Sequence, residues 1–484
     1  MSVSELPRIQ ADFYLRVLDS EVRVHAIRAA EPHGFSGAVV DSRNVTAGCA
    51  FIALPGRFAD GHDYIADAVS RGATVVFAHA DRADAAFLDS LEAVSSDSGF
   101  TLLACDNPLG ALHRIAKAHL ARFPELIKVG VTGSNGKTTT KELIASILAT
   151  KGHTWRSRGN LNSEIGLPLA ILEIGPDHRF AVFEIAMDGI GQIELLTRLV
   201  QPDYAIVTNT GLAHTEFVHS REGVAREKRM IFSQFTGTET AFVPDDDEYA
   251  SMLAAGIRGR IVRFGTRATP EYGGYRTRGL TGGVLSFGGR EIAVNLVGSA
   301  MGLNALAAAV VTAEMGIGLD GIQAGIESVV PMFGRAQILR GACTVVLDCY
   351  NANPQSMHAA LDLLTDGAGS RQVCVLGSML EIGERSRIEH EQVGKRLAQL
   401  PVQAVVFVGP HMRDAHAACT HAGFGGQSYW ASDVSAAEAV VRKAVRPGDV
   451  VLLKGSRAVG LEKLLPVVDP SLTTLVPEEA GEVS

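Results

Sequence analysis

The chain of 484 residues lacks several features that mark particular classes of protein. It has no uncharged apolar run of about 18 residues, which a membrane-spanning helix requires. Aromatic residues make up only 6% and the formal net charge is −9. This composition argues against a protein that coats nucleic acid or inserts into a membrane. The N-terminal sequence also has no basic start followed by an apolar core, so we expect a cytoplasmic protein.

Cysteine is present but not in a pattern that indicates a metal or redox site. The six cysteines form no CxxC pair and no tight cluster with histidine. Such spacings would be typical of a zinc site or a redox motif. In a chain of this length we instead expect buried free thiols in a reducing compartment.

Apolar runs and turn residues divide the chain into three blocks, in agreement with roughly 100–200 residues per domain. We predict an α/β protein with a small N-terminal α/β domain at 1–123. A central P-loop mononucleotide-binding domain with a parallel sheet follows at 124–334, and a C-terminal Rossmann-like α/β domain at 335–484. In each block, short apolar runs alternate with helical patterns. That order is typical of mostly parallel sheets, whose ligands bind at the carboxyl ends of the strands.

The expected strands are short apolar runs that end at turn residues. They lie at 38–40, 50–54, 74–78, 101–104, 127–131, 180–185, 204–208, 241–243, 261–264, 344–347, 373–376, 404–408 and 450–453. The expected helices lie at 64–70, 109–122, 138–151 and 303–313. The glycine-rich segment 266–297 indicates hairpins added at the edge of the central sheet. No Gly-x-Gly-x-x-Gly follows the first strand of the third block, so dinucleotide binding is not indicated.

The strongest local signal is a glycine-rich loop between an apolar strand and an amphipathic helix. Glycines let backbone amides turn toward phosphate oxygens, and the helix N-terminus adds its positive end. Lys137 would reach the β- and γ-phosphates of ATP, and the Thr138 hydroxyl would bind Mg²⁺. A glycine turn that only caps a helix is the alternative. The predicted nucleotide-binding residues of this loop are Gly133, Ser134, Asn135, Gly136, Lys137, Thr138 and Thr139.

The usual P-loop spacing would place its first glycine at Val131, whereas the first glycine here is Gly133. This shorter loop is similar to the ATP loop of the Mur ligases and folylpolyglutamate synthetases, which make amide bonds through an acyl phosphate. Further segments resemble Mur ligases in the same order along the chain, from about 40 to 465. They are 41–45, 51–54, 60–63, 159–162, 165–168, 183–185, 191–197, 208–209, 213–214, 222–228, 348–357, 377–383 and 454–457.

The segment 348–357, Asp-Cys-Tyr-Asn-Ala-Asn-Pro-Gln-Ser-Met, resembles the Mur ligases that add a dipeptide. The resemblance implies ATP-dependent addition of D-alanyl-D-alanine to UDP-N-acetylmuramoyl-tripeptide, with release of ADP and phosphate. It also implies a monomer with ATP and two Mg²⁺ ions as cofactors. A ligase that adds the third residue of the peptide is an alternative, but the Asp-Asn-Pro-Arg string of diaminopimelate-adding members is missing.

The resemblance implies metal and catalytic roles for residues that would otherwise have ordinary structural explanations. Glu184, at a strand end, would bind Mg²⁺, although alone it could be a solvated acid. His214 would bind a second Mg²⁺, although alone it could be a loop histidine. Lys228 would be carbamylated and bind the same ion, although alone it could lie on a solvated helix face.

Other residues take implied nucleotide and substrate roles from the same resemblance. Arg335 would reach the γ-phosphate when the domains close, Asp348 would bind the ribose and Tyr350 would lie beside the nucleotide. The implied adenine ligand is Asn304. The implied substrate-binding residues are Ser42 and Arg43 for the uridine nucleotide, Asn160 and Asn162 for the muramoyl peptide or phosphate, and Ser456 and Arg457 for the dipeptide carboxylate.

The chain departs from the family pattern beside Asn304. The usual histidine and first asparagine are replaced by Ala300 and Met301, so contacts with adenine would be weakened or replaced. Ser378 stands where the family often has aspartate. These departures motivate a second hypothesis, a nucleotide-binding scaffold with weakened catalysis. The residues that argue against it are intact: Lys137, Thr138, Glu184, His214 and Lys228.

Overall fold

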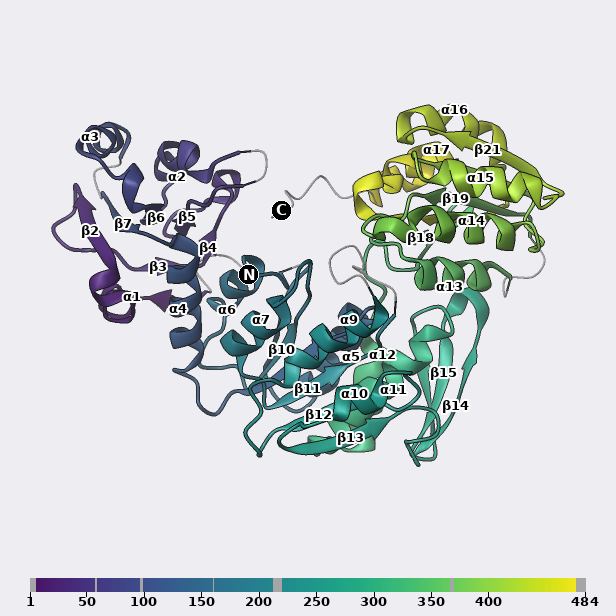
Figure 1. Cartoon of the computed structure of the whole chain (residues 1–484), viewed down its shortest axis with the longest axis horizontal. Coiled ribbons are helices and arrows are strands. Elements are labelled where there is room, and N and C mark those ends of the chain that lie inside the picture. Colours follow the sequence, from purple (N-terminus) through teal and green to yellow (C-terminus); the bar gives the residue numbers. More distant parts are fainter. Residues whose placement is uncertain are drawn as a thin grey trace.

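The computed structural model describes residues 6–56, 59–95, 99–159, 161–211, 220–365 and 370–475. They form three α/β units, each built on its own main sheet, which confirms the predicted fold class. The first and third units stand on opposite sides of the central one (Figure 1). Over the described part of the chain, no helix combines the length and apolar character needed to cross a membrane.

The first unit is a five-stranded sheet in the order β2, β7, β6, β5, β4. Only β2 runs antiparallel to its neighbour. Its strands are β2 (Val22–Ile27), β4 (Ala38–Val39), β5 (Ala50–Ile52), β6 (Val75–His79) and β7 (Phe100–Cys105), and its helices are α1 (Ala11–Leu18), α2 (Ile65–Ser70), α3 (Ala85–Val94) and α4 (Pro108–Leu120). A separate short antiparallel pair joins β1 (Arg8–Ile9), before β2, to β3 (Phe35–Ser36), after it.

The central unit is a six-stranded parallel sheet in the order β13, β12, β11, β8, β10, β9. Its first strand, β8, lies between β10 and β11, so the crossovers leave it in opposite directions. A ligand crevice forms at such a switch point, beyond the carboxyl ends of the strands. The strands are β8 (Ile127–Thr132), β9 (Thr154–Arg156), β10 (Phe180–Glu184), β11 (Tyr204–Val207), β12 (Thr240–Pro244) and β13 (Arg260–Phe264).

Helices cover both faces of the central sheet because successive strand side chains point to opposite sides. One core cluster holds Val182 and Ile206 with α5 and α11, whereas the next residues, Phe183 and Val207, belong to the cluster with α6 and α7. The helices are α5 (Lys137–Ala149), α6 (Gly166–Ile171), α7 (Gln192–Val200), α9 (Arg221–Arg229), α10 (Ala250–Ala254), α11 (Ala300–Glu314) and α12 (Leu319–Ser328).

The glycine-rich segment forms an antiparallel meander of β14 (Tyr272–Thr277), β15 (Gly283–Phe287) and β16 (Arg290–Val294). The predicted hairpins are therefore confirmed, but their predicted place at the sheet edge is wrong. The meander is a separate sheet, and its apolar residues Leu285 and Ile292 pack in one cluster with α11 and α12. The meander buries its apolar face against these helices and does not pair with β13.

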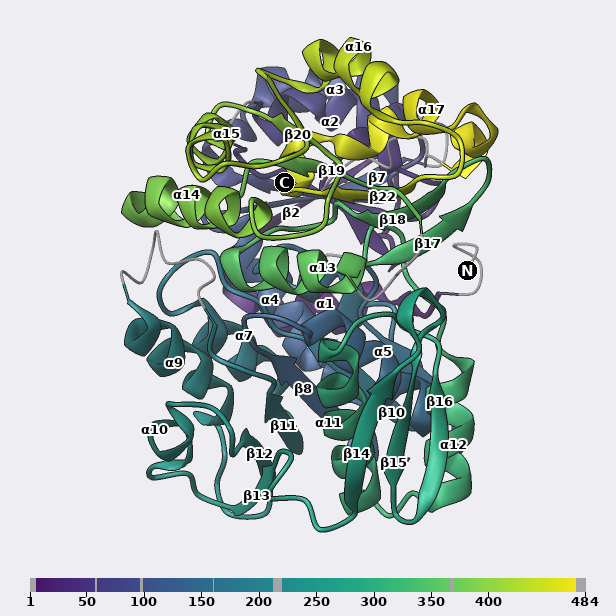
Figure 2. The same cartoon turned by 90° about the vertical axis from the view of Figure 1, so that its right-hand side faces the viewer.

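The third unit is a six-stranded sheet in the order β17, β18, β22, β19, β20, β21, in which only β17 is antiparallel. Its helix α13 lies on the side that faces the central unit (Figure 2). The strands are β17 (Gln337–Arg340), β18 (Thr344–Asp348), β19 (Gln372–Gly377), β20 (Ala404–Val408), β21 (Gln427–Ala431) and β22 (Val450–Lys454). The helices are α13 (Pro354–Thr365), α14 (Ser386–Leu397), α15 (Met412–His421), α16 (Val434–Ala444) and α17 (Leu465–Val468).

Two features of the interior bear on stability. One hydrophobic cluster runs continuously from the first sheet through α4 into the central sheet, whereas the third unit has two clusters built largely from its own residues. All six cysteines are free and buried, as predicted. Burial raises the pKa of the Cys105 thiol to about 11, which keeps it protonated and unreactive.

Candidate active site

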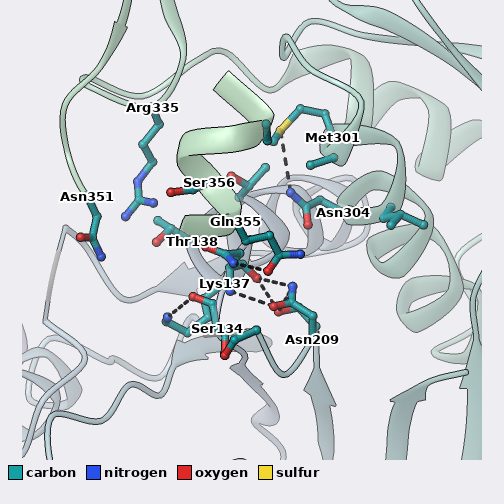
Figure 3. A pocket seen from close by; sticks show the side chains of 18 of the residues that line it. Ser134, Lys137, Thr138, Asn209, Met301, Asn304, Arg335, Asn351, Gln355 and Ser356 are labelled. Atoms are coloured by element: carbon teal, nitrogen blue, oxygen red, sulfur yellow. Dashed lines mark hydrogen bonds between the residues drawn. The ribbon is translucent and has the colours of Figure 1, made fainter. Parts of the chain in front are cut away.

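A cavity of about 980 Å³ lies between the central and third units. The central unit contributes the loop after β8, the carboxyl ends of β10 and β11, and the start of α11. The third unit contributes the segments that follow β18 and begin α13. Figure 3 shows Lys137 and Asn304 on one side of this space, with Arg335 and Asn351 on another. The switch point of the central sheet thus opens toward the third unit.

The loop between β8 and α5 needs both of its glycines. Gly133 has φ +153° and Gly136 has φ +79°, conformations that favour glycine. A Cβ at Gly133 would overlap Thr208 Oγ1, and one at Gly136 would overlap Asn304 Oδ1. The absence of side chains therefore lets β11 and α11 approach the loop and fix its shape.

Lys137, the first residue of α5, folds back over this loop. Its Nζ donates to the carbonyl oxygens of Gly133 at 2.9 Å and Ser134 at 3.4 Å. Burial lowers the pKa of Lys137, and the nearby carboxylate of Glu184 partly opposes this effect. Thr138 is buried directly behind it on the cavity wall.

Glu184 ends β10 and is only 2% exposed. Its Oε1 accepts a hydrogen bond from Asn162 Nδ2 at 2.8 Å, whereas Oε2 has no hydrogen-bond partner among the described residues. Burial raises the pKa of this carboxyl, but the ammonium groups of Lys141 and Lys137 outweigh burial and the net pKa is lowered. An ionised carboxylate with one open oxygen on the cavity wall fits a hard cation such as Mg²⁺.

Lys141 is a residue of this site that our sequence analysis missed. Its side chain is fully buried, and Nζ donates to Ser157 O at 2.6 Å. The same nitrogen lies 3.0 Å from Glu142 Oε1 and 3.9 Å from Glu184 Oε2. The spacing could have indicated it: Lys141 lies four residues after Lys137, and residues four apart share one face of a helix.

The predicted second metal site is described only in part. Lys228 on α9 is 1% exposed and does not line the cavity. Burial, together with repulsion from Lys137, lowers the pKa of Lys228 well below its ordinary value. His214 and Asn160 lie outside the described residues. Within the described ranges, no three His, Cys, Asp or Glu side chains are arranged to hold a metal ion.

The wall around Asn304 is mostly apolar. Asn304 is buried, and its Nδ2 donates only a weak hydrogen bond to Met301 Sδ at 3.8 Å (Figure 3). Ala300, Leu303 and Val330 also line the cavity. Leu303 and Val330 are large hydrophobic residues with exposed side chains. This wall can therefore hold a flat ring by apolar contact, and the Asn304 amide can form a hydrogen bond with the edge of that ring.

The residues predicted to contact the nucleotide from the third unit line the cavity together. The Arg335 guanidinium lies 4.0 Å from the centre of the Tyr350 ring, and burial raises the pKa of Tyr350. Asp348 Oδ2 pairs with Lys454 Nζ at 2.8 Å. Lys454 also donates to Asn351 O at 2.9 Å. Lys454, whose role the sequence did not reveal, therefore holds the loop after β18 in place.

Four predicted substrate residues, Ser42, Arg43, Ser456 and Arg457, do not reach the cavity. Ser42 is buried in the first unit, and Arg43 beside it pairs with Asp41 at 2.6 Å. Arg457 Nη1 pairs with Glu462 Oε1 at 2.8 Å. The cavity thus gathers the predicted nucleotide and metal side chains of the described residues, together with Asn162, but not Lys228 or these four.

Comparisons with known proteins agree with this architecture. Three family models match: the Mur ligase family catalytic domain over residues 35–119, the Mur ligase middle domain over 131–312 and the Mur ligase glutamate ligase domain over 334–457. A UDP-N-acetylmuramoyl-tripeptide–D-alanyl-D-alanine ligase from Treponema pallidum is 36% identical over 437 residues, which cover 90% of this chain and 94% of that protein.

Solved structures are similar over nearly the whole chain. MurF from Acinetobacter baumannii has a TM-score of 0.83 at 26% identity, covering 96% of this chain and 99% of that one. The MurF ligase from Thermotoga maritima, solved in complex with ADP, has a TM-score of 0.74 at 26% identity, covering 91% of this chain and 98% of that one. These matches confirm the resemblance predicted from the sequence, and the chain belongs to the Mur ligase family.

Proposed function

We propose that this chain is an ATP-dependent ligase that adds D-alanyl-D-alanine to UDP-N-acetylmuramoyl-tripeptide and releases ADP and phosphate. The observation that carries the proposal is the cavity between the central and third units, where Lys137, Glu184 and Arg335 meet. The name of the Treponema pallidum relative supports the substrates, and the ADP in the Thermotoga maritima structure supports the nucleotide. The same names favour dipeptide addition over addition of the third residue.

The chemistry requires a free carboxylate to become a good leaving group. Transfer of the γ-phosphoryl group of ATP to the carboxylate gives an acyl phosphate, the dipeptide amine attacks its carbonyl carbon, and phosphate departs. Lys137 and Arg335 place two cations on the cavity wall, where they stabilise negative charge on the transferred group. The enclosing third unit limits access of water, which would hydrolyse the acyl phosphate.

Thr138 and Glu184 would hold Mg²⁺, which when bound neutralises charge on the phosphate oxygens. For a second Mg²⁺ we propose His214 and a carbamylated Lys228, as in related ligases. Deep burial of Lys228 supports carbamylation because it disfavours an ammonium group. A carbonyl signal at a lysine carbamate in ¹³C spectra, present with ¹³C-bicarbonate and absent from Lys228→Ala, would test this assignment.

The remaining roles complete the proposal. The unit at 1–123 holds the uridine nucleotide through Ser42 and Arg43, the unit at 124–334 binds ATP, and the unit at 335–484 closes over it. Asn304, Asp348 and Tyr350 contact the nucleoside. The substrate peptide and dipeptide are assigned to Asn160, Asn162 and Arg457. We further expect a cytoplasmic monomer.

Phosphate release by the purified protein tests the function. We expect release only when ATP, Mg²⁺, UDP-N-acetylmuramoyl-tripeptide and D-alanyl-D-alanine are all present. Lys137→Met should lower the rate at least about 100-fold, because one preorganised donor to a developing charge contributes about that much. The matched control, Lys151→Met, changes an exposed lysine just after α5 and should leave the rate unchanged. Release that requires a single amino acid instead would indicate the third-residue ligase, and background release would indicate the scaffold.

A further inference from the structure

Three side-chain amides join the phosphate loop to the third unit. Asn135 Nδ2 donates to Gln355 Oε1 at 2.9 Å, and Asn353 Nδ2 donates to Asn135 Oδ1 at 2.7 Å. The partners lie 220 and 218 residues further along the chain, at the start of α13. Because Asn135 donates with one end of its amide and accepts with the other, both bonds fix its orientation. We call Asn135, Asn353 and Gln355 the amide clasp.

The central half of the clasp is held rigidly. Thr208 Oγ1 donates to Asn135 O at 2.6 Å, and Asn135 N donates to Asn209 Oδ1 at 3.0 Å. Asn209 Nδ2 also donates to Asn135 O at 2.9 Å. The end of β11 therefore fixes the backbone of Asn135, so its side chain is presented at one defined place.

The other half moves only with α13. Asn353 Oδ1 accepts from Ser356 N at 2.9 Å, which caps the first turn of the helix. Asn353 N donates to Ser356 Oγ at 3.0 Å. The side chain of Asn353 is thus tied at one end to its own helix and at the other to the phosphate loop. A displacement of the third unit would break its bond with Asn135.

Gly211, after β11, leaves room for the clasp. A Cβ at Gly211 would overlap Gln355 Oε1 and would lie 3.3 Å from Asn135 Nδ2. The carbonyl of Gly211 accepts from Ser134 Oγ at 2.7 Å, so this position is part of the loop network. Gln355 itself is exposed, and its contacts with the loop are therefore separable from the core of the third unit. Figure 3 shows its side chain beside Lys137 and Asn209.

We propose that the amide clasp is a reversible latch that sets the position of the third unit relative to the phosphate loop. The inference rests on the proposed function and makes Asn353 and Gln355 positioning residues for it. Lys137 and Glu184 stand on the central wall of the cavity, whereas Asp348 and Lys454 stand on the wall of the third unit. Residues of both walls can contact the same nucleotide only when the two units hold one relative position. Neutral amide hydrogen bonds are weak individually, so the latch can open in every cycle.

Two variants disturb the clasp from opposite sides. Gln355→Met keeps the side-chain length but removes the acceptor, and Gly211→Ala keeps Gln355 but fills its space. We expect each to lower kcat about 3- to 10-fold, the loss that corresponds to one or two neutral hydrogen bonds. KM for the UDP-peptide and the melting temperature should stay unchanged. Small-angle scattering with ATP should show a larger radius of gyration, and the double variant should lose no more than either single one.

A matched control is Gln392→Met, which changes an exposed glutamine on α14 and should behave like the unmodified protein. Unchanged kcat and scattering in Gln355→Met would overturn the proposal. It would also be overturned if the losses of the two single variants multiplied in the double variant, because the residues would then act independently. If the unmodified protein released no phosphate, the proposed function would fail, and the scattering comparison alone would decide whether the clasp exists.

Discussion

Lys141 shows how much of this site depends on a charge that never reaches solvent. It donates to Ser157 O and pairs with Glu142, whose other oxygen lies 2.7 Å from Arg156 Nε. Lys141→Met would leave the Glu184 and Glu142 carboxylates with less positive charge nearby. Because removal of one partner from a buried pair costs about 3–5 kcal/mol, we expect the free energy of unfolding to fall by that amount and the pKa of Glu184 to rise.

Thermal unfolding of Lys141→Met, compared with the exposed-site variant Lys151→Met, measures this loss. We expect a lower melting temperature for the first and an unchanged one for the second. Equal melting temperatures would show that the buried lysine does not stabilise the fold.

At the scale of residues, the sequence predicted the phosphate loop because all its members are contiguous. The roles of Lys137 and Thr138 are predicted from adjacent residues, whose types and order are typical of phosphate binding. Lys141 and Lys454 were missed because Ser157, Glu184 and Asp348, which they contact, come from other parts of the chain. No local pattern places these groups beside the two lysines. Arg43 and Arg457 were identified by type, yet the structure pairs each with an acid and places both away from the cavity.

Helix α4 connects the first and central units through a buried histidine. His119 is fully buried, and its Nε2 lies 2.8 Å from the carbonyl oxygen of Ile174, to which it donates. Burial, helped by the charge of Arg122, lowers the pKa of His119 from an ordinary 6.5 to about 4, although the hydrogen bond to Ile174 opposes the shift. The imidazole therefore stays neutral in the folded chain at pH 5.

This shift has a defined sign. Between pH 6.5 and 4 the unfolded chain binds a proton at His119 that the folded chain does not, so stability is present above pH 6.5 and is lost as the pH falls to 4. The loss is about 3 kcal/mol as an order of magnitude. His119→Gln keeps a donor for Ile174 and should flatten the pH dependence of chemical unfolding over this range. His421→Gln, at an exposed position, is the control, and equal slopes in the two variants would contradict the assignment.

At the scale of elements, the inner strands of the three main sheets were predicted, as were the edge strands β4 and β13, but the edge strands β2, β9, β17 and β21 were missed. The inner strands β19 and β20 contain continuous apolar runs, because helices cover both faces of their sheet. By contrast, β2 and β21 lie at sheet edges and mix polar with apolar residues. Their hydrophobic pattern is too weak to distinguish these strands from loops.

The whole molecule contains two tryptophans in different units, which makes its cooperativity measurable. Trp155 on β9 packs against Phe183 in the cluster shared by the first and central units. Trp430 on β21 belongs to the third unit and donates to Gly409 O at 3.0 Å. Since the third unit has clusters of its own, we expect it to unfold separately. Fluorescence of Trp155→Phe and Trp430→Phe in urea should give two different midpoints, and coincident midpoints would show that all three units unfold together.

At this largest scale the sequence predicted three α/β units and their order. It did not predict which units share a hydrophobic core or which two form a cavity between them. The core shared through α4 depends on contacts such as that between His119 and Ile174, 55 positions apart. The cavity between the second and third units depends on partners 218 and 220 positions apart. No local pattern reports such contacts. The exact limits of the predicted domains remain a prediction.

The crowding of the phosphate loop has a consequence for inhibition. Gly133, Gly136 and Gly211 each face a neighbouring side chain with which any added carbon would collide. A compound that bound the backbone of these three positions would leave the organism few substitutions by which to escape it. Resistance would have to arise elsewhere on the cavity wall, for example at Val330, whose side chain is exposed.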